Sequence, residues 1–305
     1  MKFLLLSDIH LVIDNPVARL DDLTEVQWEK LEYVFNYASK KHIRYILQAG
    51  DLTHTKRSWS LLEKLSSYLI TKEQKIFMVK GQHDSYYHNM ENQKTTTGIL
   101  ISSGIIDLLN SSPHTFDNVH VYGCSYGNPI PEIESFKSIN ILVIHAPIGH
   151  GNSLNQNHYE CTNAETFIKN SKFDLVLCGD IHEKFIVTYN SRIICNTGIM
   201  LRHEVSKEML NHQPCFFIYD TETQSIDEIK IPCSASKEIL SRDHIDKQKN
   251  RQNNFDNFIE QVKNADYVHS VNFNDNLKNI IKANKTSKEV QSIIEKYLQE
   301  GKSDL

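Results

Sequence analysis

The sequence predicts an α/β fold, in which short buried strands alternate with amphipathic helices along the chain. Short apolar runs of strand length recur from the N-terminus onward, and most are rich in Ile, Leu, Val or Phe. Segments with a helical spacing of apolar residues lie between the first of these runs. Strands that alternate with helices favour parallel strand pairing, with the helices packed on the sheet.

Several apolar runs are expected to form largely buried strands. They are Lys2–Leu6, Arg44–Gln48, Lys75–Val79, Asn118–Tyr122, Ile139–Ile144, Phe173–Cys178, Arg192–Cys195 and Cys215–Tyr219. Two helices are expected between the first three strands, because apolar side chains follow helical spacing from Leu31 to Ala38 and from Leu62 to Leu69.

The character of the chain changes after about Pro232, so we expect one domain over residues 1–232 and an extension over 233–305. The extension is polar and helical, with amphipathic stripes from Phe255 to Val262 and from Val290 to Leu298. These helices could pack on the main domain, or they could form an arm that docks a partner through its apolar faces. The sequence leaves both interpretations open.

The bulk properties allow a large core but not a protein that coats nucleic acid. The chain has 305 residues, of which 40% are hydrophobic and 23% charged, and its net charge is −5. That charge argues against binding nucleic acid through bulk basicity. It does not exclude a nucleic-acid enzyme, because bound metal cations offset carboxylates locally.

We expect a cytoplasmic protein with no membrane span. No apolar stretch approaches the ~20 residues that a spanning helix needs, and the apolar run at the N-terminus is too short for a signal peptide. The six cysteines form no C-x-x-C pair, which favours reduced and mostly buried thiols.

Polar motifs follow the predicted strands at the points where the strands end. They are Asp8-Ile9-His10, Gly50-Asp51, Gly81-Gln82-His83-Asp84, His145 and Gly179-Asp180-Ile181-His182. In parallel sheets, ligands bind beyond the carboxyl ends of the strands. Asp, His and amide side chains gathered there are what a two-metal phosphoesterase site requires.

The spacing inside each motif suggests how its side chains act. A spacing of two in an extended segment points both side chains the same way, so Asp8 and His10 can reach one cation. Gly50 lets the backbone turn closely, so that the Asp51 carboxylate can bridge two metals. The carboxylate of Asp84 could orient His83 and raise its pKa, which suits a proton donor to a leaving group.

These residues resemble the signature of the calcineurin-like metallophosphoesterases, which reads D-x-H, G-D, G-N-H-D, H, G-H-x-H, over roughly residues 1–230. The resemblance implies a four-layer α/β/β/α sandwich that carries two divalent metals, here followed by the helical extension. By position, it assigns the first metal to Asp8, His10, Asp51 and His182, and the second to Asp51, Gln82, His145 and Asp180. It also implies that His83 is the general acid, steadied by Asp84.

Two positions depart from the family pattern. Gln82 replaces the usual Asn, and Asp180 replaces the usual first His of G-H-x-H. Both still present an oxygen, so the second site becomes richer in oxygen ligands, which suits Mn²⁺ better than Zn²⁺. We therefore expect two Mn²⁺ ions, with a weakened second site as the alternative.

One subgroup of the family looks most similar, namely the SbcD-type nuclease subunits. The run from Ala49 to His54 is similar to their second motif, in which a His after the bridging Asp helps to place DNA; His54 is the match. The run from Asn196 to Arg202 resembles their loop after the last metal motif, which makes Arg202 a candidate for substrate positioning. The resemblance implies DNA as substrate, an SbcC-like coiled-coil ATPase docked through the C-terminal helices, and a homodimer.

Three functions therefore compete. The leading one is a Mn²⁺-dependent DNA exo- or endonuclease subunit that acts in repair or recombination. The second is a stand-alone phosphodiesterase or phosphatase acting on small molecules or phosphoproteins, which would use the same metals and residues. The third is a non-catalytic scaffold on a degenerate phosphoesterase fold, for which Gln82 and Asp180 are the only hints.

Overall fold

The computed structural model describes residues 1–86, 94–133, 137–151, 154, 161–243, 254–257 and 273–300. The chain divides into two units, residues 1–242 and 243–305, and each is described by itself. The boundary that the sequence suggests at residue 232 stays a prediction. Among the described residues, no helix combines the length and the apolar character that a membrane span needs.

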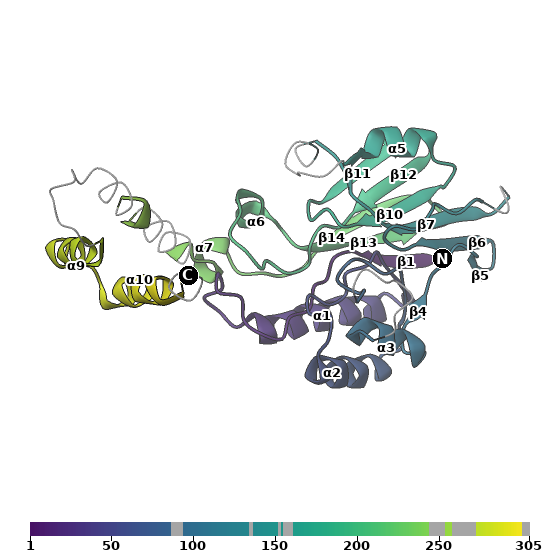
Figure 1. The fold of residues 1–305 in the computed structure, drawn as a ribbon. Coiled ribbons are helices and arrows are strands. Elements are labelled where there is room, and N and C mark those ends of the chain that lie inside the picture. Colours follow the sequence, from purple (N-terminus) through teal and green to yellow (C-terminus); the bar gives the residue numbers. More distant parts are fainter. Residues whose placement is uncertain are drawn as a thin grey trace. The chain divides into compact units, whose positions relative to one another are not determined.

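Two six-stranded sheets form the centre of the first unit (Figure 1). The first sheet has the order β14-β13-β1-β2-β3-β4, and β1 to β4 pair in parallel. Its strands are β1 (Lys2–Leu6), β2 (Tyr45–Gln48), β3 (Lys75–Met78), β4 (Asp107–Leu108), β13 (Cys215–Asp220) and β14 (Ser225–Lys230). The return strand β13 pairs antiparallel with β1, and β14 pairs antiparallel with β13.

The second sheet has the order β11-β12-β10-β7-β6-β5. Its strands are β5 (His114–Phe116), β6 (Val119–Cys124), β7 (Ile139–His145), β10 (Leu175–Gly179), β11 (Phe185–Tyr189) and β12 (Arg192–Asn196). The four inner strands are parallel, and the two outer strands are antiparallel to their neighbours. A small parallel pair, β8 (Ile148–Gly149) and β9 (Thr162–Asn163), lies after β7.

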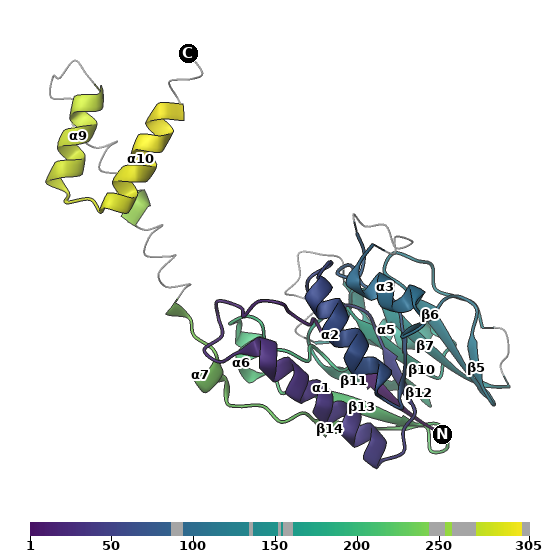
Figure 2. The same cartoon turned by 90° about the horizontal axis from the view of Figure 1, so that it is seen from below.

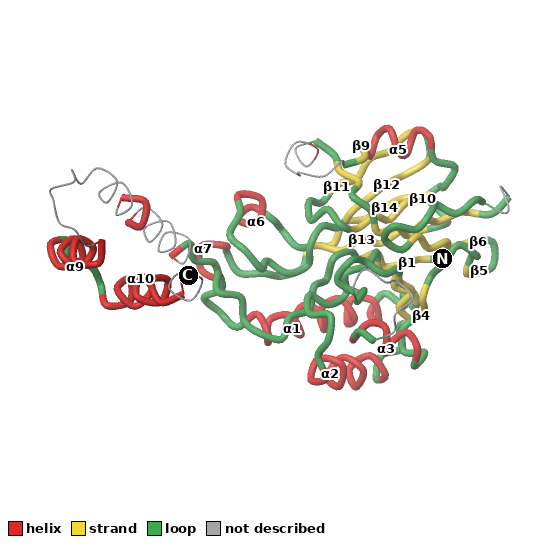
Figure 3. The backbone as a smooth tube through the Cα atoms, in the orientation of Figure 1, coloured by secondary structure: helices red, strands yellow, loops and turns green. Residues whose placement is uncertain are grey.

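Helices cover the outer faces of the two sheets (Figures 1 and 3). The first sheet carries α1 (Leu23–Lys40), α2 (Trp59–Ile70) and α3 (Thr96–Ser102), and the second carries α5 (Ala164–Asn170). The two short helices α6 (Lys207–Asn211) and α7 (Ser236–Ile239) follow later in the unit. Side chains cap the main helices: Asp22 accepts a hydrogen bond from the amide of Thr24, and Ser58 accepts one from the amide of Leu61.

Alternation along β1 shows how the layers arise. Leu4 and Leu6 point into the core beneath α1 and α2, whereas Phe3 and Leu5 point into the core between the two sheets. A third core, which includes Ile144 of β7, lies beneath α5. The chain therefore has the predicted α/β class, with two large sheets between two helical layers.

The edge strands β11 and β14 were not expected from the sequence. Most residues of β11 and β14 are exposed or half-buried, so they lack the continuous apolar runs that mark the inner strands. The early strands β1 to β3 pair in parallel as expected, and the later strand β13 pairs antiparallel with β1. Hydrophobic runs indicate burial but not strand direction, and only the sheet context decides the direction.

The second unit contains α9 (Phe273–Ala283) and α10 (Lys288–Glu300) (Figure 2). The predicted stripe on α10 is uneven, because Val290 and Ile294 are half-buried while Ile293 and Tyr297 are exposed. Of the earlier stripe, Phe255 is described and exposed, whereas the residues from 258 to 262 lie outside the described part of the chain.

Candidate metal centre at the strand ends

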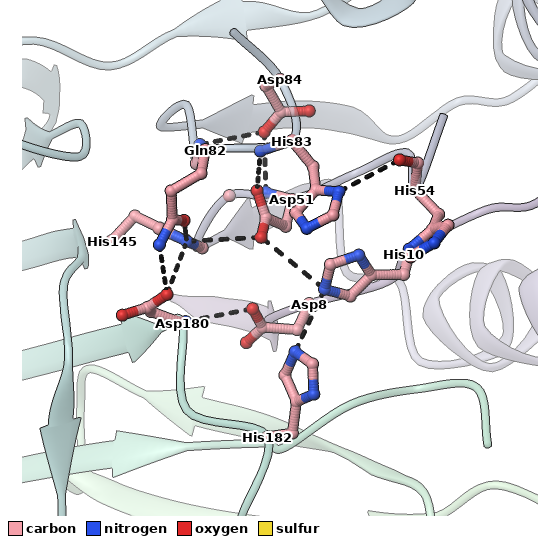
Figure 4. Close-up of polar contacts among 12 residues, drawn as sticks. Asp8, His10, Asp51, His54, Gln82, His83, Asp84, His145, Asp180 and His182 are labelled. Carbon is pink, nitrogen blue, oxygen red and sulfur yellow. Dashed lines mark hydrogen bonds and ion pairs between the residues drawn. The ribbon is translucent and has the colours of Figure 1, made fainter. Parts of the chain in front are cut away.

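The predicted site residues come together where parallel strands of both sheets end (Figure 4). The first sheet supplies side chains after β1, β2 and β3, and the second supplies them from β7 and after β10. The residues are Asp8, His10, Asp51, Gln82, His145, Asp180 and His182, which we call the candidate metal centre. Asp8, His10, Asp51 and His145 are all buried, so this is an interior polar site.

Asp51 lies at the middle of this group. Its Oδ1 atom accepts a hydrogen bond of 2.8 Å from the backbone amide of His83, which fixes the plane of the carboxylate. Its Oδ2 atom is then 3.6 Å from Nε2 of His10 and 3.5 Å from Nε2 of His145. One carboxylate oxygen thus lies between imidazoles that come from opposite sheets.

On one side of Asp51, Asp8 and two histidines face one another. Nε2 of His10 is 3.2 Å from Nε2 of His182, and ligand atoms of Asp8, His10 and His182 all lie within 4.8 Å of one another. Asp8 Oδ1 accepts a hydrogen bond from the amide of Asp180, but its Oδ2 is buried with no hydrogen-bond partner in the described part of the chain. This oxygen and the facing nitrogens fit a cation, because a cation accepts all their lone pairs.

On the other side, Gln82, His145 and Asp180 converge with Asp51. Nδ1 of His145 donates to the carbonyl of Ala49 at 2.6 Å, which leaves Nε2 as an acceptor in the neutral ring. The amide nitrogen of Gln82 donates to Asp180, so its Oε1 faces that same Nε2 at 2.6 Å. In the neutral ring this Nε2 and the Gln82 Oε1 are both acceptors, so both could serve as ligands of one cation; in the charged ring Nε2 donates a hydrogen bond to Oε1.

The electrostatics of the centre also fit bound cations. Burial raises the pKa of Asp8 to about 8. Burial, together with the neighbouring imidazoles of His182 and His203, holds the pKa of His10 well below its usual range. Burial alone would lower the pKa of His145, but the carboxylates of Asp51 and Asp8 raise it overall. A divalent cation bound here would neutralise the carboxylates of Asp51 and Asp8, and it would take the place of the proton that they favour on His145.

The backbone around the centre adopts conformations that side chains other than glycine rarely take. Asp8, His10, Asp51 and Asp180 have φ angles of 45°, 51°, 55° and 94°. Such conformations cost about 1–3 kcal/mol each and cluster at functional sites. Gly50 allows the close approach that the sequence suggested: its φ is 91°, and a Cβ there would lie 2.4 Å from Nδ1 of His145.

Asp84 does not orient His83 as the sequence suggested. Its buried carboxylate accepts hydrogen bonds from the amides of Asp51, Leu52 and Gly81, and from the hydroxyl of Thr97 at 2.7 Å. Adjacent residues in a turn can point in different directions, and here the carboxylate turns inward to hold the loop that carries Asp51. The carbonyl oxygen of His54 takes the expected role, because it lies 3.0 Å from Nδ1 of His83.

Three further histidines form the entrance to the centre. The rings of His54 and His83 are stacked, with centroids 5.1 Å apart. His203, which the sequence analysis missed, lies 5.3 Å from the ring of His54 and 5.9 Å from that of His10. Burial and the neighbouring His54 lower the pKa of His203 to about 3. His203 directly follows Arg202. The resemblance of the run from Asn196 to Arg202 therefore indicated the neighbouring segment but not His203 itself.

Arg202 is placed differently from the other predicted residues. Its buried guanidinium donates to the backbone carbonyls of His212 and Ser234. Its own carbonyl accepts a hydrogen bond from Arg19. These contacts tie together loops of the first unit, and the structure does not bring the Arg202 guanidinium to the candidate metal centre through any contact among the described residues.

The model of the calcineurin-like phosphoesterase family matches residues 1–184, a segment that contains every residue of the candidate metal centre. No curated protein matches the chain.

Solved structures are similar at low identity. An archaeal phosphodiesterase is 15% identical, with a TM-score of 0.42 over 75% of this chain and 99% of that one. A hypothetical protein of Pyrococcus horikoshii is 11% identical, with a TM-score of 0.43 over 81% and 93%. Vps29 of Entamoeba histolytica in complex with zinc is 10% identical, with a TM-score of 0.37 over 76% and 100%.

Proposed function

This chain belongs to the calcineurin-like phosphoesterase family, and from that premise we propose that it hydrolyses phosphodiesters with two divalent cations. The observation that carries the proposal is the position of Asp51. One oxygen of its carboxylate lies 3.6 Å and 3.5 Å from imidazole nitrogens of opposite sheets. A carboxylate between these two imidazoles would serve as a ligand of both cations.

The proposed ligands form two overlapping sets. Asp8, His10, Asp51 and His182 would hold the first cation, and Asp51, Gln82, His145 and Asp180 the second. When bound, two divalent cations neutralise phosphoryl oxygens and lower the pKa of a water molecule. The hydrogen bonds from His83 N to Asp51 and from His145 Nδ1 to Ala49 would hold the ligands in orientation before any metal binds.

We assign manganese to the centre because of its oxygen ligands. The second set offers oxygens from three side chains, Asp51, Gln82 and Asp180, and one imidazole, and such oxygen-rich sites suit Mn²⁺. The assignment is checked by activity of the metal-free protein reconstituted with single metals. Mn²⁺ should restore turnover best, and full activity with Zn²⁺ but none with Mn²⁺ would contradict the assignment.

His83 is the proposed general acid. Its Nδ1–H is directed at the carbonyl oxygen of His54, so Nε2 carries the proton that can be transferred when the ring is charged. The ring is half-buried at the entrance, beside the ring of His10 at 4.9 Å. From there it can give a proton to the departing oxygen of a phosphodiester. Asp84 would serve by holding the Asp51 loop and not by contact with the reacting groups.

The proposed substrate is DNA, with His54 as the positioning residue. His54 is exposed and stacks on His83, and Lys56 and Arg57 follow it closely in the chain. An exposed imidazole that is followed closely in the chain by two cationic residues suits the phosphates that flank a scissile bond. For Arg202 we propose only an indirect role, in which its hydrogen bonds hold the loop that carries His203.

The C-terminal helices are the proposed docking arm for a coiled-coil ATPase. Tyr297 and Ile293 of α10 are exposed apolar side chains on one helix. We expect this chain to co-purify with a coiled-coil ATPase of the same source. Changing both Ile293 and Tyr297 to Asp should abolish the co-purification. Retention of the complex in that double variant would contradict the arm, and a homodimer through these helices would appear as a doubled mass in solution.

The test of function is Mn²⁺-dependent release of nucleotides from end-labelled duplex and single-stranded DNA, with a small aryl phosphodiester in parallel. Degradation of DNA that is lost in His83→Ala would support the nuclease. Hydrolysis of the small ester with DNA untouched, even after addition of the ATPase, would favour the stand-alone phosphodiesterase. Activity on neither substrate, in a protein that has bound its metals, would favour a scaffold.

A further inference from the structure

A pocket of about 570 Å³ lies at the N-terminal ends of α2 and α3. We call it the Trp59 pocket. Trp59, Leu62 and Ile99 give it apolar walls, and Arg57 and Lys94 contribute cationic groups. Among the described residues that line it, none is acidic. A pocket with this lining suits an anionic ligand that has an apolar part.

Trp59 is the unusual residue of this pocket. It is the first residue of α2 and 81% exposed. The other tryptophan, Trp28, packs its ring against Tyr68, with centroids 5.8 Å apart, and lies under the ammonium of Lys64. Among the described residues, Trp59 has no such ring partner. A large indole left in solvent at the edge of a pocket offers a flat face for stacking.

The guanidinium of Arg57 is held in position. The guanidinium of Arg57 lies 3.6 Å from the ring centroid of Tyr86, and its Nε donates to the carbonyl of Lys94. These contacts fix the plane of Arg57 while the residue stays exposed. A flat cation beside an exposed indole matches a ligand that combines phosphates with a planar ring.

Short hydrogen-bonded links join the pocket to the entrance of the centre. The amide of Thr96 donates to the carbonyl of Lys56, and the hydroxyl of Thr95 donates to the carbonyl of Asp84. His54 stacks on His83 and precedes Arg57 by three residues. A polymer that places a phosphodiester at His83 can therefore extend toward Trp59.

We propose that the Trp59 pocket binds one unpaired nucleotide of the substrate, with its base stacked on Trp59 and its phosphates facing Arg57 and Lys94. The base must be unpaired and unstacked, because within a duplex the neighbouring base pairs cover both of its faces. The proposal rests on the proposed function, since it names the substrate of the same site as a nucleic acid that is single-stranded next to the scissile bond.

The test measures binding to the full-length, metal-loaded chain. A short oligothymidylate and an abasic oligomer of equal length and charge are compared by fluorescence anisotropy at low temperature, with the oligomers checked for integrity afterwards. Stacking on an aromatic side chain contributes about 1–3 kcal/mol per base, which equals about 5- to 150-fold in affinity. Trp59→Ala should lose that factor for oligothymidylate and nothing for the abasic oligomer.

Two controls make the result specific. Ile70→Ala changes an exposed apolar residue at the other end of α2 and should leave both affinities unchanged. In a Trp28→Phe background, Trp59 is the sole tryptophan, and oligothymidylate should quench its fluorescence while the abasic oligomer should not.

Equal affinity of wild type and Trp59→Ala for oligothymidylate, or an unquenched Trp59, would overturn the proposal. Hydrolysis of a small ester is measured separately on the same preparations. A chain that is inactive but discriminates the base at Trp59 would refute the proposed hydrolysis and keep the pocket. A chain that hydrolyses the small ester but binds both oligomers equally would refute the pocket and keep the proposed hydrolysis.

Discussion

The candidate metal centre and the Trp59 pocket are built in opposite ways. In the centre, Asp8 and His10 are nearly inaccessible, on a backbone with positive φ angles. In the pocket, Trp59 and Arg57 are exposed and lie on an ordinary helix start. The centre gathers buried carboxylates and imidazoles, whereas the pocket presents an exposed indole and an exposed guanidinium. On our proposals, the chemistry and the recognition of the substrate therefore reside in separable parts of the chain.

The largest effect is expected from Asp51→Asn. The change removes the carboxylate proposed to be shared by both cations, so turnover should fall to or beyond the upper end of the about 10²–10⁴-fold range known for a single general acid. Binding of oligothymidylate at Trp59 should change little, because the pocket does not use Asp51. Hydrolysis assays, metal analysis and anisotropy on one preparation would measure turnover, metal content and affinity for oligothymidylate. Unchanged metal content and activity would remove Asp51 from the proposed centre, and a large loss of affinity for oligothymidylate would contradict the independence of the pocket.

The second-largest effect on turnover is expected from His83→Ala. Loss of a general acid lowers turnover by about 10²–10⁴-fold, while metal content stays at the wild-type level because His83 is not a proposed ligand. His114→Ala, in the edge strand β5, is the matched histidine control and should keep its turnover. A His83→Ala variant as active as that control would remove His83 from the mechanism.

Asp84→Asn tests whether this residue holds a loop or acts on His83. The Asp84 carboxylate accepts hydrogen bonds from the backbone amides of Asp51 and Leu52. In Asp84→Asn, the side-chain NH₂ group would replace one accepting oxygen and would face an N–H group that also donates. The free energy of unfolding should fall by about 1–3 kcal/mol or more, measured by urea denaturation. Asp227→Asn, on the exposed strand β14, should change stability little. Full stability with an altered pH profile of turnover would instead support an orienting role.

The smallest effect is expected from Ser58→Ala, at the start of α2. The change removes the hydrogen bond from the Leu61 amide to the Ser58 hydroxyl. Loss of such a cap costs about 0.5–2 kcal/mol in stability, without an effect on hydrolysis of a small ester. Asp22→Ala removes the corresponding cap of α1 and should cost a similar amount. A loss of small-ester turnover in Ser58→Ala alone would show that pocket and centre are coupled.

Much of the fold and of the candidate site could be predicted from the sequence, because inner strands and their ends leave strong signals. Runs such as Lys2–Leu6 are apolar on both faces since they lie between two cores. Residues at the ends of parallel strands meet at one edge, so Asp8, Asp51 and Asp180 could be brought together without a structure. The predicted α/β class is confirmed, and the roles of the individual residues stay proposals.

What could not be predicted depends on the direction of side chains and of edge strands. The sequence placed Asp84 beside His83, but only the turn geometry shows that its carboxylate points inward to Thr97. His203 carries no motif, and it reaches His54 only because its loop folds back over the centre. The strand β14 alternates polar and half-buried residues, which resembles an ordinary surface segment.

A two-metal centre that shares Asp51 can be tested by titrating the metal-free chain with Mn²⁺ and recording electron paramagnetic resonance. We expect two ions per chain, with the spectrum changing to that of a magnetically coupled pair as the second ion binds. In Asp51→Asn that coupled signal should be absent. One ion per chain, or two ions whose spectra stay independent in the wild type, would show that Asp51 is not a ligand shared by two cations.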